Sequence, residues 1–193
     1  MKRLLIVLVF LFFTVITFSQ NEHKSIYSGG MLIVQPGFVT TENSHQQIRS
    51  GNIGIGGILR FYFHEYFTAG IYGGTQKTNY NSANSKNSYI NLGYGGPFVG
   101  FSHQIEKFRY TVSAFVGMGA IKNLHIESQS NNLISEAYLY KNSILVLSPI
   151  LSLDYALSQR LSLTFQAVCL TAKVNNDKSF YNPALQIGIL FNR

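Results

Sequence analysis

Hydrophobic side chains alternate with small or polar ones along most of the chain. Between residues 53 and 63, one face of the alternation is rich in isoleucine, leucine and phenylalanine, and the other carries glycines and Arg60. A period of two is typical of β-strands whose two faces meet different surroundings. Repeats of this pattern predict eight strands, which lie near residues 27–40, 53–63, 67–77, 89–104, 108–119, 145–155, 161–168 and 185–192.

The predicted strand near 89–104 changes phase within its length. Apolar residues occupy even positions over 90–94 but odd positions over 99–101. One extra residue between the two groups would bring both of them onto the same face. The sequence therefore predicts a β-bulge around Gly95 and Gly96.

The connections between the predicted strands alternate between two kinds. Three are short, at 64–66, 105–107 and 156–160. Four are longer, polar and rich in Asn, Ser and Thr, at 41–49, 78–86, 128–136 and 175–181. Even-stranded outer-membrane barrels have short periplasmic turns and longer extracellular loops. We therefore expect an all-β protein, an eight-stranded antiparallel up-and-down transmembrane β-barrel with both of its termini on the periplasmic side.

The composition supports a membrane barrel over a soluble one. Charged residues make up 12% of the chain, whereas ordinary soluble domains contain about 25%. A closed β-barrel pairs its backbone groups internally, so it crosses a bilayer without a spanning helix. A soluble barrel of the lipocalin kind would instead carry charge on its outside. The charges in the middle of the predicted strands are Arg60, Arg109 and Asp154, and all three lie on the small-residue face.

The first 20 residues are predicted to be a signal peptide. A basic start at 1–3 is followed by an apolar run over 4–18, which is shorter than the ~20 residues that a spanning helix needs. Cleavage is expected near residues 19–21, which leaves 21–193 as the barrel. Together with the barrel, this signal predicts a location in the outer membrane of a Gram-negative bacterium. A single cysteine, Cys169, excludes an intramolecular disulfide.

The chain resembles the small outer-membrane β-barrel family, which includes the transmembrane part of OmpA and the OmpX-type proteins. The resemblance rests on the signal, the eight alternating strands and the terminal pattern Leu185-x-Ile187-x-Ile189-x-Phe191. The end of the signal, FSQN, is similar to those of Bacteroidota-type secreted proteins. The resemblance implies recognition of the C-terminal strand by the barrel-insertion machinery, and we expect a monomer. Family members commonly end on an aromatic residue, whereas this chain continues past Phe191.

Aromatic residues surround the short turn at 64–66, which is predicted to lie at the periplasmic interface. We expect part of an aromatic girdle there, formed by Tyr62, Phe63, Tyr66 and Phe67. If Phe63 pairs with Phe67, Arg60 lies opposite Gly70. A glycine opposite Arg60 leaves it space, because the interior of an eight-stranded barrel is only just wide enough for side chains.

Charged residues on the inward face predict an ion pair inside the barrel. Centring the long loop at residues 131 and 132 places Arg109 opposite Asp154, and Arg60 projects into the same lower half. An unpaired buried charge costs several kcal/mol. We therefore expect these three candidates to form an ion-pair plug, which either holds the barrel shut or acts as a gate or solute site.

The most enzyme-like cluster is HIES, from His125 to Ser128, with Glu136 nearby. Lipid A deacylases, which are barrels of similar size, use a Ser/His pair with a carboxylate, because the histidine must take the serine proton and be oriented itself. Those enzymes carry His-x-Ser on a strand, whereas the spacing here places the two side chains on opposite faces. No phosphate loop, zinc-ligand spacing or carboxylate dyad is visible, and we expect no catalytic residue, no cofactor and no metal.

Lysines gather at the predicted extracellular rim. They are Lys77, Lys86, Lys122, Lys141, Lys173 and Lys178. The outer leaflet carries phosphorylated lipopolysaccharide, whose charge lysines at this height would neutralise. Ordinary solvated loop charge is the alternative. The formal net charge of +7 does not indicate nucleic-acid binding, since no basic helix or aromatic platform accompanies it.

These features predict a non-catalytic barrel with a structural or surface-interaction role, in contact with outer-membrane lipid and lipopolysaccharide. Two alternatives from other classes remain open. One is a lipid-modifying hydrolase related in chemistry to lipid A deacylases. The other is a narrow, porin-like channel or a solute-binding barrel.

Overall fold

The computed structural model describes residues 27–63, 66–82, 85–130, 133–174 and 178–192, and the predicted signal peptide lies outside them. Nearly all of the described chain is β-strand. The strands are β1 (Tyr27–Val34), β2 (Gly37–Glu42), β3 (Gln47–Phe63), β4 (Phe67–Ser82), β5 (Ser85–Ile105), β6 (Phe108–Ser130), β7 (Leu133–Ala156), β8 (Leu161–Val174) and β9 (Lys178–Asn192). In this part of the chain no helix is long and apolar enough to cross a membrane. The predicted all-β fold is confirmed.

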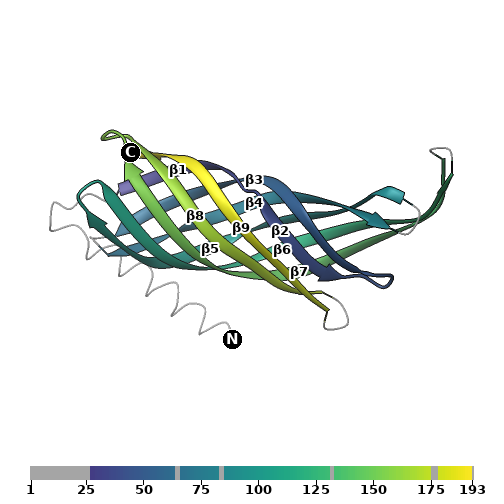
Figure 1. Ribbon diagram of the computed structural model, residues 1–193. Coiled ribbons are helices and arrows are strands. Elements are labelled where there is room, and N and C mark those ends of the chain that lie inside the picture. The colour runs from purple at the N-terminus through teal and green to yellow at the C-terminus, as the bar shows by residue number, and fades with distance from the viewer. Residues whose placement is uncertain (1–26, 64–65, 83–84, 131–132, 175–177, 193) are drawn as a thin grey trace, which may run out of the picture.

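The strands form one closed antiparallel barrel (Figure 1). From β3 to β9, each strand pairs with the next one along the chain, and β9 pairs with β1 and β2 to close the barrel. Because β1 and β2 both pair with β3 and β9 and are separated only by Gln35 and Pro36, they are two parts of one barrel strand. Across this break Gln35 still exchanges backbone hydrogen bonds of 2.9 and 3.1 Å with Gly54. The barrel therefore has eight strands, as predicted.

The register of the β3–β4 hairpin agrees with the prediction. Phe63 pairs with Phe67, and three residues further along Arg60 pairs with Gly70. A Cβ atom at Gly70 would meet the backbone oxygen of Leu59 and lie 2.8 Å from the Phe98 ring. A side chain at position 70 therefore has no room.

The β6–β7 hairpin also has the expected register, since Arg109 pairs with Asp154. Irregular pairing occurs further up this hairpin, on both sides of Ser128. There His125 and Ile126 are both buried although they are consecutive, which breaks the alternation of faces.

The predicted bulge in β5 is wrong. β5 pairs with β6 in one constant register from Tyr89 to Ile105. Even-numbered residues point inward throughout, so Ile90, Leu92 and Tyr94 are buried in the barrel. The phase argument fails because both faces of β5 carry large apolar residues, so the two apolar groups need not lie on the same face.

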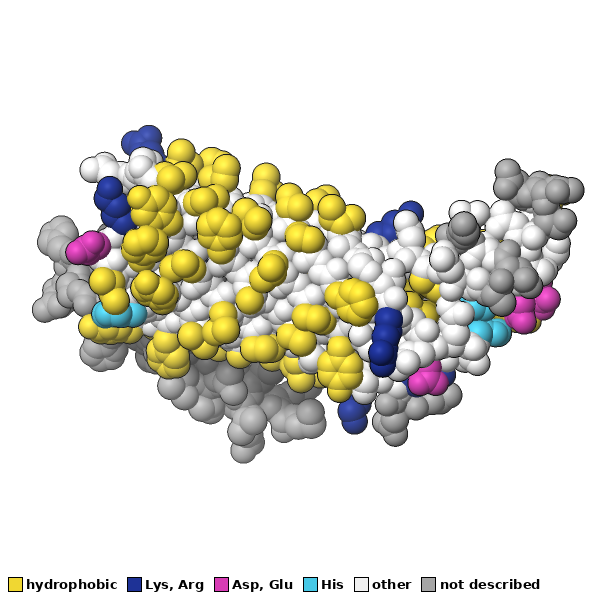
Figure 2. Space-filling model, in the orientation of Figure 1, with side chains coloured by type: hydrophobic (Ala, Val, Ile, Leu, Met, Phe, Trp, Pro, Cys, Tyr) yellow, Lys and Arg dark blue, Asp and Glu magenta, His cyan; other side chains and the backbone are white. Residues whose placement is uncertain are grey.

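A broad apolar belt covers the outside of the barrel (Figure 2). Its side chains come from alternate positions of the strands, and they include Leu32, Ile55, Ile71, Val112, Leu151 and Ile187. An aromatic girdle lies at the end with the short turns, where Phe67 contacts Phe63 and Phe101 at ring distances of 6.0 and 6.2 Å. Tyr62 is not part of this girdle as predicted, because it lies on the inward face and is 5% exposed. The belt is the surface that a bilayer requires.

Polar residues dominate the opposite end, where lysine and arginine side chains follow the edge of the apolar belt (Figure 2). The β6–β7 hairpin projects furthest at this end (Figure 1). β6 has 23 residues and β7 has 24, whereas a membrane-spanning strand needs about 9–11. More than half of this hairpin therefore lies beyond the lipid, on the side with the long loops.

Candidate functional site

An ion pair joins Arg60 and Asp154 in the part of the lumen that lies toward the short turns. The Arg60 Nη1 lies 3.0 Å from Asp154 Oδ2, and Nη2 donates to Ser152 Oγ at 3.1 Å. Thr164 donates to the other carboxylate oxygen at 2.8 Å. Arg60 is 1% exposed and Asp154 is 3% exposed. The pair is thus buried and hydrogen-bonded on both sides, as a stable buried pair must be.

Arg109, the third predicted member of the plug, lies next to this pair. Its guanidinium carbon is 4.1 Å from the centre of the Tyr62 ring, and Nη2 donates to Gln104. Tyr62 in turn accepts a hydrogen bond from Arg60 at 3.1 Å. The three predicted charges therefore belong to one cluster, in which Tyr62 separates the two arginines.

The middle of the lumen is packed with aromatic and amide side chains. The hydroxyls of Tyr72 and Tyr94 are 2.6 Å apart, and Tyr94 donates to Gln35 at 2.8 Å. Gln186 also donates to Gln35, at 2.7 Å. Phe115 packs edge-on against both tyrosines at ring distances of 5.0 and 6.0 Å. These buried side chains pack together in the middle of the lumen.

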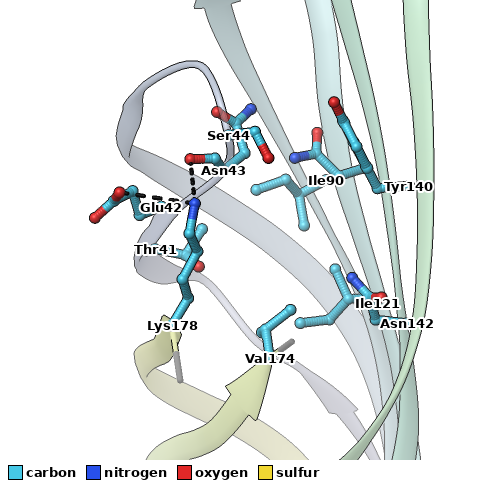
Figure 3. Close-up of a pocket in the computed structure, with 11 residues that line it drawn as sticks. Thr41, Glu42, Asn43, Ser44, Ile90, Ile121, Tyr140, Asn142, Val174 and Lys178 are labelled. Atoms are coloured by element: carbon cyan, nitrogen blue, oxygen red, sulfur yellow. Dashed lines mark hydrogen bonds and ion pairs between the residues drawn. The ribbon is translucent and has the colours of Figure 1, made fainter. Parts of the chain in front are cut away.

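A cavity of about 260 Å³ lies at the mouth of the barrel on the side of the long loops, where the proposed orientation places the outside of the cell (Figure 3). Ile90, Ile121 and Val174 form its apolar wall, and polar or charged residues line the remainder, among them three asparagines and Tyr140. Lys178 from β9 crosses one side, where its Nζ donates to the Asn43 backbone oxygen at 2.7 Å and lies 3.7 Å from a Glu42 carboxylate oxygen. This predicted lipopolysaccharide contact is therefore turned toward the β2–β3 loop.

Two histidines and a glutamate meet above this cavity. His45, in the β2–β3 loop, stacks on His125 of β6 with ring centres 4.3 Å apart and planes 12° apart. The Nδ1 of His45 lies 3.7 Å from Glu127 Oε2, and its Nε2 lies 2.9 Å from the Tyr140 hydroxyl. Burial, with the neighbouring His45 as a second cause, lowers the pKa of His125. A neutral imidazole ring is thus favoured at His125.

Tyr80 supports His125 from inside the barrel. Its hydroxyl donates to Asn123 Oδ1 at 2.8 Å and lies 3.2 Å from His125 Nδ1. The side-chain nitrogen of Asn43 donates to the same hydroxyl at 3.3 Å. Burial raises the pKa of Tyr80 to about 12, so the hydroxyl keeps its proton at neutral pH.

The HIES segment is not arranged as a Ser/His pair in the described part of the chain. The side chains that contact His125 there come from Asn43, His45 and Tyr80. Ser128 pairs with Glu136 across the irregular part of the hairpin. The partners of His125 are therefore an amide, an imidazole and a phenol, whereas the hydrolase alternative needs a serine hydroxyl beside this histidine.

Four of the predicted rim lysines face outward, and these are Lys77, Lys122, Lys141 and Lys173. Lys77 pairs with Asn91, Asn91 pairs with Lys122, and Lys122 pairs with Lys141. These residues form one outward row across β4, β5, β6 and β7, which we call the lysine row. Lys86 lies on β5, but its side chain is outside the described part of the structure.

Sequence reasoning missed the contribution of the β2–β3 loop. His45 is separated from His125 by 80 positions, and no local spacing pairs them. The interpretation of HIES as a Ser/His motif gives Glu127 no role in a site. The sequence signal for this site is the spacing of His125 and Glu127. Residues two positions apart on one strand have their side chains on the same face.

No protein-family model and no curated protein matches the chain. Several solved structures do. Neisserial surface protein A aligns with a TM-score of 0.56 and 10% identity over 84% of this chain and 96% of its own. Ail of Yersinia pestis aligns with a TM-score of 0.50 and 15% identity over 87% of this chain and 100% of its own. OprG of Pseudomonas aeruginosa aligns with a TM-score of 0.50 and 13% identity over 85% of this chain and 96% of its own.

The chain folds as a small outer-membrane β-barrel. At these identities the likeness concerns the fold alone, and it agrees with the apolar belt and the closed sheet described above. The predicted location in the outer membrane of a Gram-negative bacterium follows from this fold and belt together.

Proposed function

We propose that this protein is a non-catalytic outer-membrane barrel that acts at the cell surface by binding the phosphates of lipopolysaccharide along its lysine row. The observation that carries the proposal is the direct opposition of Lys122 and Lys141 on the outside of the barrel. Side chains directly opposite in a sheet have Cβ atoms about 4.5–5.5 Å apart, and like charges at that distance destabilise it. A bound anion between the two ammonium groups removes this cost.

Neighbouring residues extend the site in both directions. Asn91 lies between Lys77 and Lys122 in the row and offers an amide to the same ligand. The Nζ of Lys77 lies 5.1 Å from the centre of the Tyr89 ring, which keeps it close to the surface. On the side of the row toward the short turns, the same strands carry exposed apolar side chains, among them Ile71, Met118 and Leu145. Figure 2 shows lysine and arginine side chains along the edge of the apolar belt, which is the level of lipid headgroups.

The alternatives fit the described residues less well. A channel needs a continuous path, whereas the Tyr72–Tyr94–Phe115 layer fills the middle of the lumen. A hydrolase of the predicted kind needs a serine beside His125. Ail, a barrel of the same fold, was crystallised with the heparin analogue sucrose octasulfate, which supports the general idea that such barrels hold polyanions. The narrower resemblance to OmpA and OmpX-type barrels of Bacteroidota remains part of the proposal, supported by strand number and loop pattern.

The test compares lipopolysaccharide binding of the folded barrel in detergent with that of the variant Lys122→Gln/Lys141→Gln. We expect the double variant to bind roughly thirtyfold more weakly at low salt, since each lysine near a charged membrane surface contributes about 1 kcal/mol and the two together about 2 kcal/mol. The difference should shrink at 0.5 M salt, about where screening becomes strong. Lys107→Gln, in the short β5–β6 turn at the other end, is the matched control. Equal binding by the double variant and the control would contradict the proposal.

A further inference from the structure

His45, His125 and Glu127 place three metal-binding groups together at the extracellular mouth. Each offers one ligand atom, and these atoms lie within 4.8 Å of one another. The side chains of His45 and Glu127 are 26% and 47% exposed, so an ion has access from the extracellular side. Two imidazoles and a carboxylate are a ligand set that zinc uses in sites with an open fourth position.

The hydrogen bonds of His125 leave one ring nitrogen available. The Nδ1 of His125 has two neighbours, the Tyr80 hydroxyl at 3.2 Å and the Asn43 side-chain nitrogen at 3.5 Å. Because Tyr80 gives its single proton to Asn123 at 2.8 Å, the shorter of these two contacts has the Nδ1–H of His125 as its donor. The lone pair of the ring is then on Nε2. A ligating histidine commonly donates its other N–H to a fixed acceptor, which sets its tautomer and orientation.

The geometry of His45 indicates the same arrangement. Its Nε2 is 2.9 Å from the Tyr140 hydroxyl, which can accept the ring proton. Nδ1 then turns its lone pair toward Glu127 Oε2, 3.7 Å away. This separation is too long for a hydrogen bond. It is close to the roughly 3.3 Å between two ligands that each lie about 2.0–2.1 Å from a tetrahedral zinc ion.

We propose that His45, His125 and Glu127 form a binding site for a divalent transition-metal ion of the Zn²⁺ type. The ion lies between the His45 nitrogen and the Glu127 oxygen. Because the two imidazole rings are stacked with planes 12° apart, their in-plane lone pairs run side by side. Binding therefore requires the His45 ring to turn out of the stack, so that its Nδ1 and the His125 Nε2 point at the same ion. It joins the β2–β3 loop to the β6–β7 hairpin, with its fourth position open to water or to an external ligand. Tyr80 and Tyr140 are positioning residues, because each touches a ligating ring and not the ion. The site is separate from the lysine row and does not depend on the proposed function.

The experiment titrates ZnCl₂ into the untagged, folded full-length barrel in detergent and follows the heat of binding. We expect one ion per barrel with a dissociation constant in the micromolar range or tighter. His45→Gln and Glu127→Gln should each weaken binding at least tenfold, because each removes one of three ligands. These two side chains are partly exposed, so both variants should still fold into the barrel. Folding is verified on dodecyl sulfate gels, where an unheated folded barrel migrates differently from a heated one.

His103→Gln is the matched control, since His103 stacks on Tyr66 near the short turns at the opposite end. Co²⁺ provides a second readout, because a tetrahedral site gives intense visible absorption that the two ligand variants should lose. The inference is overturned if zinc binds no more tightly than millimolar. It is equally overturned if both ligand variants bind like the wild type, or if His103→Gln weakens binding as much as they do.

Discussion

Arg60 and Asp154 form a buried ion pair with an N–O distance of 3.0 Å, although they lie on strands that do not pair with each other. Arg60 is on β3 and Asp154 is on β7, so the pair connects two separate parts of the barrel wall across the lumen. Arg60 therefore reaches the carboxylate from a strand that makes no backbone hydrogen bonds with β7. At Gly70, opposite Arg60, the space that a side chain would need is taken by the Leu59 backbone oxygen and the Phe98 ring. The guanidinium carbon of Arg60 lies 6.0 Å from the centre of that ring.

Arg60→Ala or Asp154→Ala should each lower the free energy of unfolding by about 3–5 kcal/mol, because each leaves the other charge buried and unpaired. Urea unfolding of the barrel in lipid vesicles measures this change. The double variant should cost clearly less than the sum of the single ones, as expected for groups in contact.

Arg109→Ala serves as the comparison, since the Arg109 guanidinium is partly exposed and lies over the Tyr62 ring. We expect it to cost about 1 kcal/mol, the usual size of a cation–π contact. Additive effects of the Arg60 and Asp154 changes would show that the cross-lumen pair does not contribute to stability.

Gly70→Ala should destabilise the barrel. The added Cβ meets the backbone oxygen of Leu59 and the Phe98 ring, and neither gives way easily. Overpacking of this kind costs about 1–3 kcal/mol. Thermal or urea unfolding of the purified barrel measures the effect.

Gly93→Ala is the control on the neighbouring strand β5, where nothing lies within 4 Å of the added atom. It should be neutral or stabilise by up to about 0.5–1 kcal/mol, because alanine restricts the unfolded chain more than glycine does. If Gly70→Ala and Gly93→Ala change the free energy of unfolding equally, close packing around position 70 is not the reason for a glycine there.

The sequence predicted the fold well where the two faces of a strand meet different surroundings. On β3 the lipid side needs large apolar groups, while the lumen beside Arg60 needs small ones, so the alternation is clear. On β5 it failed, because Ile90 and Leu92 fill the lumen with apolar groups of the same kind that face lipid elsewhere. A binary pattern cannot separate two apolar environments, and only the register from neighbouring strands decides between them.

The candidate sites were predictable to a smaller extent. The outward lysines and the Arg109–Asp154 register follow from strand period and loop centre. The pairing of His45 with His125 does not, because it depends on how the β2–β3 loop bends over the barrel mouth. Asn43 shapes that loop by accepting hydrogen bonds from the backbone N–H groups of His45 and Gln46 at 2.8 and 2.7 Å. The sequence can suggest such a turn, but its contact with His125 can be inferred only once the position of the loop on the barrel is known.

Glu106→Asn should stabilise the short β5–β6 turn. Glu106 has a φ of 52°, and it is the only non-glycine residue with a positive φ in the described part of the chain. An ordinary side chain pays about 1–2 kcal/mol in this region, which asparagine tolerates better. We expect a gain of about 0.5–1 kcal/mol in the free energy of unfolding, measured by urea titration.

Lys107→Asn, at the adjacent turn position, is the control, because Lys107 does not have a positive φ. It should leave the stability unchanged within about 0.5 kcal/mol, as exposed substitutions usually do. A loss of stability in Glu106→Asn would show that the left-handed backbone is not a source of strain here.

Orientation in the membrane decides whether the lysine row and the histidine cluster face the outside of the cell. A protease-cleavable tag inserted after residue 131, between β6 and β7, should be cut on intact cells, because these two strands are far longer than a membrane-spanning strand needs to be. The same tag after Gln159, in the short β7–β8 turn, should be cut only after the outer membrane is opened. Immunoblotting for the released fragment gives the readout. A tagged protein that fails to fold is recognised on gels because heating no longer changes its migration. Cleavage at Gln159 on intact cells, with protection of the hairpin tag, would invert the barrel and place both proposed sites in the periplasm.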